Sequence, residues 1–478
     1  MTHACSITNS WRRARLGWTS VALVVLCQFP SAERDVLAQS RKELQRELQA
    51  LRERLEAVED ELEESRHERD ETESQDSRRS SDEDFAEFTP AWQREGLEAP
   101  GPLRGVYDKP FLASFWRRAH VGGYTELEYH DFEDGILGIP EGFRMHRTNL
   151  FFFTELSDRV RFGSEIEFET EFEGAEVSDE IEIKLEMAFI DWALFEEFKL
   201  RGGALLAPLG RVNVNHDGPV RELTIRPLVS TFIIPTTLTE AGVGAHGDFE
   251  ISESFGLSYE VYAVNGFNIL DEAGNVDFAV TDPEQAIREG RASIGGDLNS
   301  GIASTGRIGF EILNALEFGA SWHNGTYDEK SDNYLTILAG DFAYSQEVSI
   351  VELGLEGEIA DANFERDAFA KAAGIPDDFW GYYVQGSVGL MPEFLRNLVP
   401  CVFDDDGSRL TFVFRYEWVD LAGDQGEVLE PGITFRPIAD TVFKFSYRHT
   451  GKSIGLRSIP GRTDWDDTGF VFSLSSYF

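Results

Sequence analysis

The chain has 478 residues and a formal net charge of −43, from 86 acidic and 43 basic side chains. Phosphate backbones repel a chain this acidic, and its basic residues are scattered, which argues against nucleic acid as a partner. Beyond the N-terminal leader no stretch reaches 18 consecutive apolar residues, so a membrane passage would have to use strands and not helices.

The N-terminus has the pattern of a secretory signal. Three arginines precede an apolar run at 16–29, and small residues ending at Ala38 offer a cleavage site. We therefore predict a signal peptide over residues 1–38, with a second possible cut after Ala32. Cleavage leaves Cys401 as the one cysteine, so the mature chain can form no intrachain disulfide.

Residues 39–64 show a heptad pattern that predicts a coiled coil. Apolar residues recur at alternating spacings of four and three among Arg and Glu, and a lone helix would leave this stripe without a partner. We expect several chains to associate through it; a single solvated, charged helix is the alternative. The predicted seam comprises Leu44, Leu48, Leu51, Leu55, Val58 and Leu62.

Residues 65–117 are expected to link this helix to the next domain. The segment is first acidic and polar without apolar residues, and then rich in proline and aromatic residues. Its aromatic residues are expected either to plug the mouth of the domain that follows or to line the periplasmic membrane interface.

From residue 118 to 478 the hydrophobic period changes to two. Glutamates at every second position of 165–173 alternate with apolar residues, and 180–186 repeats the pattern. A strand places all such charges on one face, so one face is polar and the other apolar. The last nine residues alternate in the same way and end on the aromatic Phe478, which is typical of outer-membrane barrels.

Threading backward from Phe478 with alternating short and long connections gives sixteen strands. We therefore predict an all-β fold: a 16-stranded antiparallel transmembrane β-barrel over residues 118–478, preceded by a periplasmic coiled-coil helix. Short turns are expected at 157–158, 196–197, 252–254, 314–315, 345–347 and 437–440. A soluble array of β-sandwiches is the alternative fold.

The alternating charges are expected to line a water-filled lumen. Carboxylates on neighbouring strands repel each other, so they need water, a basic side chain or a divalent cation such as Ca²⁺ between them. Calcium binding here is a hypothesis, and no metal or cofactor site is predicted. The predicted lining residues are Glu165, Glu167, Glu169, Glu171, Glu180, Glu182, Lys184, Glu186 and Arg144.

Enzyme motifs are missing from the sequence. The histidines show no metal-ligand spacing, and there is no nucleophile elbow or phosphate loop. We expect a protein that is not an enzyme. A hydrolase with a Ser–His pair assembled across strands is the alternative that spacing leaves open.

Three segments resemble the phosphate-selective porin O/P family of Gram-negative outer membranes. They are the strand opening at 380–387, the basic segment Phe143-Arg144-Met145-His146-Arg147, and the passage from Leu200 to Gly210. The resemblance covers about residues 118–478 and implies a trimeric, 16-stranded porin with an inward-folded loop, often preceded by a coiled coil. This chain departs from the family in its acidity, which is unsuited to an anion pathway.

The resemblance places a pore constriction in the long connection at 205–240. Basic residues there would face acidic ones across the lumen and orient polar solutes in a transverse field. A solvated surface loop is the alternative. The predicted constriction residues are Arg211, His216, Asp217, Arg221, Glu222 and Arg226.

Together these features predict an outer-membrane porin for passive diffusion of ions and small hydrophilic solutes. Acidity favours cations or weak selectivity, although the family resemblance implies anions such as phosphate. The expected partners are outer-membrane lipid, further copies of the chain as a homotrimer, and the outer-membrane assembly machinery through the C-terminal strand. The alternative is a structural barrel that tethers the coiled coil to the cell wall or to a partner.

Overall fold

The structure is a computed structural model that describes residues 113–478, except 117–118, 133–140, 174–175, 196, 253, 272–286, 288–289, 292–293, 298, 300, 314, 391–406 and 453–467. The predicted signal peptide, the predicted coiled coil with its seam, and most of the predicted linker lie outside the described residues. Side chains are described from His120 onward, except those of residues 171–180.

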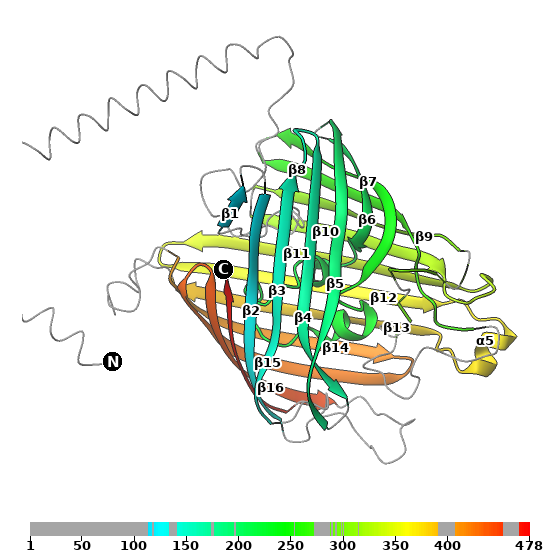
Figure 1. Cartoon of the computed structure of the whole chain (residues 1–478). Helices are drawn as coiled ribbons and strands as arrows, with labels where there is room; N and C mark the ends of the chain where they lie inside the picture. The colour runs from blue at the N-terminus through cyan, green and yellow to red at the C-terminus, as the bar shows by residue number, and fades with distance from the viewer. Residues whose placement is uncertain are drawn as a thin grey trace, which may run out of the picture. The chain divides into compact units, whose positions relative to one another are not determined.

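Sixteen antiparallel strands, β2 to β17, form one closed barrel (Figure 1), as the sequence predicts. Each strand pairs with its neighbours in sequence, and β17 closes the sheet on β2 from Gly469 opposite Phe132 to Tyr477 opposite Tyr124. The strands are β2 (Ala119–Phe132), β3 (Gly142–Glu155), β4 (Val160–Glu173), β5 (Glu176–Phe195), β6 (Phe198–Leu206), β7 (Thr239–Ser252), β8 (Phe255–Val264), β9 (Ala303–Ile312), β10 (Leu316–Thr326), β11 (Tyr334–Val348), β12 (Val351–Phe364), β13 (Asp378–Leu390), β14 (Arg409–Leu421), β15 (Asp424–Ile438), β16 (Thr441–Lys452) and β17 (Gly469–Tyr477).

Both ends of the barrel sequence meet at the start of β2. The short strand β1 (Ala113–Trp116) pairs with β2 at residues 119–121, and the chain's last residue, Phe478, exchanges two backbone hydrogen bonds with Gly123. Because the number of strands is even, the start of β2 and the end of β17 lie on the same rim, as the sequence predicts.

Short turns join the strands at this rim, mostly where the sequence predicts them. One prediction is wrong: the expected turn at 345–347 lies inside β11, which runs to Val348, and the reversal falls at Ser349–Ile350. At the other rim, β14 and β15 are joined by Ala422 and Gly423, both at positive φ. This is the left-handed geometry of a two-residue hairpin, which favours glycine.

The two faces of the barrel differ in chemistry. Alternate residues point outward and form an exposed apolar surface, whereas inward positions carry most of the buried charged side chains. Because only the outer face is continuously apolar, it is the surface suited to lipid. Outward residues include Ile181, Ile183, Leu185, Ile190, Trp192, Val243, Ile308, Leu338, Ile359, Val384, Phe412, Phe414, Ile433, Phe445 and Phe470.

Candidate functional site: the loop inside the barrel

The connection between β6 and β7 folds inward instead of over the rim. We call residues 207–238 the inner loop; it contains the single helical turn α3 (Arg211–Val214) and the π-helical turn η3 (Val229–Ile233). Most of its residues are buried. Its apolar side chains, among them Leu209, Phe232 and Ile234, form one core with inward residues of β11 to β15.

Glu358 on β12 fixes the two helical turns of the inner loop. Its carboxylate accepts hydrogen bonds from the backbone N–H of Arg211, from that of Val212 at 3.1 Å, and from the Ser230 hydroxyl at 2.9 Å. Unpaired N–H groups at the start of α3 favour such an anion. One buried carboxylate therefore holds α3 and η3 against the same wall.

The middle of the inner loop is held by a different part of the wall. Lys444 Nζ on β16 donates to the Gly218 carbonyl at 2.6 Å, and Arg436 Nη1 on β15 donates to the Pro219 carbonyl at 2.8 Å. The hydroxyls of Thr224 and Ser473 on β17 are 2.8 Å apart. Since β12 and β17 are five strands apart, the loop extends across the lumen between separate wall segments.

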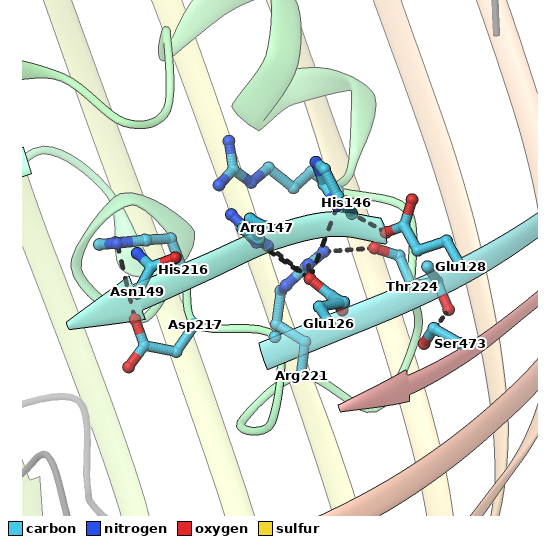
Figure 2. Close-up of polar contacts among 12 residues, drawn as sticks. Glu126, Glu128, His146, Arg147, Asn149, His216, Asp217, Arg221, Thr224 and Ser473 are labelled. Carbon is cyan, nitrogen blue, oxygen red and sulfur yellow. Dashed lines mark hydrogen bonds and ion pairs between the residues drawn. The ribbon is translucent and has the colours of Figure 1, made fainter. Parts of the chain in front are cut away.

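The wall at β2 to β5 carries a dense network of ion pairs (Figure 2). Arg147 donates to one oxygen of Glu126 from Nε at 3.0 Å and from Nη2 at 2.9 Å, and its Nη1 reaches Glu167 at 3.4 Å. Glu128 accepts from Arg144 at 2.6 Å and contacts His146 at 2.8 Å. Glu126, Glu128 and Glu167 are thus matched by basic residues from β3.

A second network lies on the wall at β14 to β16. Arg415 contacts Glu417 and Glu430 at 2.7 Å each, and Arg448 contacts the same two carboxylates at 3.0 and 2.8 Å. All four side chains are buried. Neither wall therefore presents only one sign of charge to the lumen.

All six predicted constriction residues lie on the inner loop. Arg211 reaches Glu317 at 3.0 Å and Glu356 at 3.4 Å. Burial alone would lower the pKa of Arg211, but Glu356 and Glu317 outweigh it and keep the pKa above its ordinary value.

The other five predicted constriction residues divide between wall contacts and contacts within the inner loop. His216 lies 3.1 Å from Glu186, and Tyr477 donates to Asp217 at 3.0 Å. Two further contacts reach the wall: Glu222 lies 3.3 Å from Arg436, and Arg221 lies 3.9 Å from Glu126. Two contacts stay within the loop: Arg221 donates to the Thr224 carbonyl at 2.5 Å, and Arg226 donates to the Thr236 carbonyl at 2.8 Å.

Those predicted lumen residues whose side chains are described point inward, but several do not line open water. The side chains of Glu165, Glu167 and Glu186 are almost fully buried, which differs from the solvated bore that the alternation suggested. Lys184 lies between Glu169 and Glu182, at 2.7 and 2.8 Å, where the sequence required a basic group or a cation. Glu182 and Arg144 are partly exposed; the side chains of Glu171 and Glu180 lie outside the described residues.

Two β-bulges change which residues face the lumen. His146 on β3 and Glu186 on β5 are each an extra residue between paired positions, and both point inward. A bulge inserts one extra residue into a strand and changes the direction of the side chains around it. Neither bulge was predicted. The sequence analysis also missed Glu126, Arg147 and Glu358 as residues of the site. The one signal for their inward direction is the period of two in β2, β3 and β12.

Comparisons with known proteins give distant matches, and no family model matches the chain. An uncharacterized protein of Aquifex aeolicus (strain VF5) is 36% identical over 217 residues, 45% of this chain and 46% of that protein. The chain thus matches about half the length of this relative. Membership of the phosphate-selective porin O/P family remains a prediction.

Several solved structures resemble the barrel. An anion-selective porin from Comamonas acidovorans has a TM-score of 0.47 at 9% identity, covering 75% of this chain and 99% of that one. OmpF of Salmonella typhi has 0.46 at 10%, covering 75% and 97%, and the channel DcaP of Acinetobacter baumannii has 0.43 at 11%, covering 76% and 98%. All three TM-scores are below 0.5.

Among the described residues, no helix is both long and apolar enough to cross a membrane.

Proposed function

We propose that this protein is an outer-membrane porin that lets ions and small hydrophilic solutes diffuse passively across the membrane. The observation that carries the proposal is a closed 16-strand barrel with an apolar outer face, a charged inner face and a loop folded into the lumen. A barrel of this strand number is wide enough to hold an aqueous path, and the inner loop would narrow it.

Selectivity would be weak in this proposal. Inward carboxylates are paired with arginines on both walls, so the field along the path is far smaller than a net charge of −43 implies. We propose a slight preference for cations, because partly exposed Glu182 shares Lys184 with Glu169, which also contacts His146 at 2.9 Å. Phosphate selectivity would need a basic surplus at the constriction.

A planar-bilayer measurement tests both parts of the proposal. Purified protein should give stepwise conductance, and the reversal potential in a salt gradient should have the sign for cations and a small magnitude. Strong anion selectivity would restore the phosphate interpretation. Reconstituted barrels that never conduct would contradict the porin proposal itself.

The second candidate is a structural barrel that anchors the predicted coiled coil and tethers it to the cell wall or to a partner. The burial of the inner loop favours this candidate, because a loop bound to both β12 and β17 reduces the free cross-section. The same bilayer experiment separates the two, since an anchor needs no conductance.

A further inference from the structure

Three potential metal ligands converge where the inner loop meets strand β4. Glu165, His216 and Asp217 each offer a ligand atom, and these atoms lie within 4.8 Å of one another. Glu186 on β5 is a neighbour of this group, with its Oε2 3.1 Å from His216 Nε2. The three residues are buried, and Figure 2 shows His216 and Asp217 facing each other. We call Glu165, His216 and Asp217 the loop cluster.

The spacing within the loop cluster is close to that of a metal site with three protein ligands. Bonds of about 2.0–2.1 Å to Zn²⁺ place neighbouring ligand atoms of a tetrahedral site about 3.3 Å apart. Asp217 Oδ1 lies 3.6 Å from His216 Nε2, near that value. Three protein ligands leave the fourth position of a tetrahedral ion open.

The ring of His216 is oriented as in a metal-ligating histidine. Its Nδ1 lies 3.0 Å from the backbone carbonyl of Asn213, and a carbonyl only accepts, so Nδ1 carries a proton. Nε2 is therefore the ring atom left to face Asp217, at 3.6 Å, as in a metal-ligating histidine.

The carboxylates of the loop cluster and of Glu186 are also held from behind by neutral donors. Asn149 Nδ2 donates to Glu165 at 2.8 Å and to Glu186 at 3.0 Å, and Tyr477 donates to Asp217 at 3.0 Å. Metal ligands are commonly oriented by such outer hydrogen bonds.

Two buried polar atoms beside the loop cluster lack hydrogen-bond partners among the described residues. Asn149 points into the cluster through its amide nitrogen, and its Oδ1 is unpaired. The hydroxyl of Tyr124 is also unpaired, and its ring lies 5.8 Å from that of Tyr477. Unsatisfied buried polar atoms are uncommon and often mark an ion or water bound nearby.

We propose that the loop cluster binds one divalent transition-metal ion, with Zn²⁺ as the best match to its mixed imidazole and carboxylate ligands. The ion would join β4 to the inner loop and would hold the loop against this wall.

The chain provides a matched control in a second cluster. Glu126, Glu128 and His146 also lie within 4.8 Å of one another. Arg147 and Arg144 already occupy those carboxylates at 2.9 and 2.6 Å, so a metal ion would have to displace two guanidinium groups. We expect no binding there.

Isothermal titration of Zn²⁺ into metal-stripped full-length protein in detergent tests the proposal. Wild type should bind one ion per chain, and His216→Gln and Asp217→Asn should each weaken binding at least ten-fold, whereas His146→Gln should stay within two-fold. Absence of saturable binding in wild type, or loss in His146→Gln alone, would overturn the proposal; His216 is then an ordinary imidazolium ion pair.

Crystals of wild type soaked in Zn²⁺ give a readout independent of variant folding. An anomalous peak next to His216 Nε2 is expected, and a peak only at surface sites would count against the loop cluster. Conductance is measured separately, so loss of the metal proposal leaves the porin proposal standing.

Discussion

His146 and Glu186 show how single residues decide what faces the lumen. From Glu182 to Glu186, every second residue of β5 points inward; after the bulge the inward set becomes Met187, Phe189 and Asp191. A period of two predicts the inward face only until a bulge inverts it, because one extra residue exchanges the two faces. The sequence therefore predicts the strand, its charged face and Glu186 as a lining residue, but not the two bulges or the inward positions that follow Glu186.

Arg147 offers a test of the buried charge network. Arg147→Met leaves Glu126 buried without its two guanidinium hydrogen bonds, and we expect a loss of about 3–5 kcal/mol in the free energy of unfolding. Lys184→Met is the control, because Lys184 is partly exposed and an accessible pair contributes about 0–1 kcal/mol. Denaturant titration in detergent measures both, and equal losses would contradict the importance of burial.

The inner loop is the element whose position sequence analysis could not derive. Its length and its charges were visible, and the family resemblance suggested an inward fold. Its anchors, however, lie far away in sequence: Ser230 and Arg211 meet Glu358 on β12, and Thr224 meets Ser473 on β17. Such long-range pairs follow from closure of the barrel and leave no local periodic signal.

Glu358→Ala tests whether the inner loop controls the path. The substitution removes three hydrogen bonds and leaves buried N–H groups unpaired, at about 1–3 kcal/mol per group. We expect a looser loop and therefore larger, noisier single-channel conductance. Glu352→Ala is the control, since Glu352 lies on the same strand and pairs with Arg409. Unchanged conductance in Glu358→Ala would argue that the loop does not limit the path.

At the scale of the whole molecule, the outward apolar face is what makes the barrel a membrane protein in our proposal. Val384 points outward in the middle of β13, whereas Ile350 lies at the turn after β11. An arginine at the bilayer midplane costs about 2–4 kcal/mol and about 0–1 kcal/mol near the interface. Val384→Arg should therefore impair folding into lipid vesicles far more than Ile350→Arg. Equal folding yields would contradict immersion of this face.

The predicted coiled coil at residues 39–64 concerns assembly and not the barrel itself. All sixteen strands close without it, so deleting residues 39–84 should leave channel conductance unchanged. Loss of the leucine seam should nevertheless lower the recovery of trimers in mild detergent, because the seam is expected to join several chains.

Leu51→Glu and Leu55→Glu together place charges in that seam without shortening the chain, and they should reproduce the assembly defect. Glu53→Gln, outside the predicted seam, is the control. Oligomers that survive both the deletion and the double substitution would show that the barrels associate through their own outer faces, and the seam would then be a solvated helix. Conductance lost together with the trimer would instead mean that the lumen depends on neighbouring barrels, which the closed sheet of a single chain argues against.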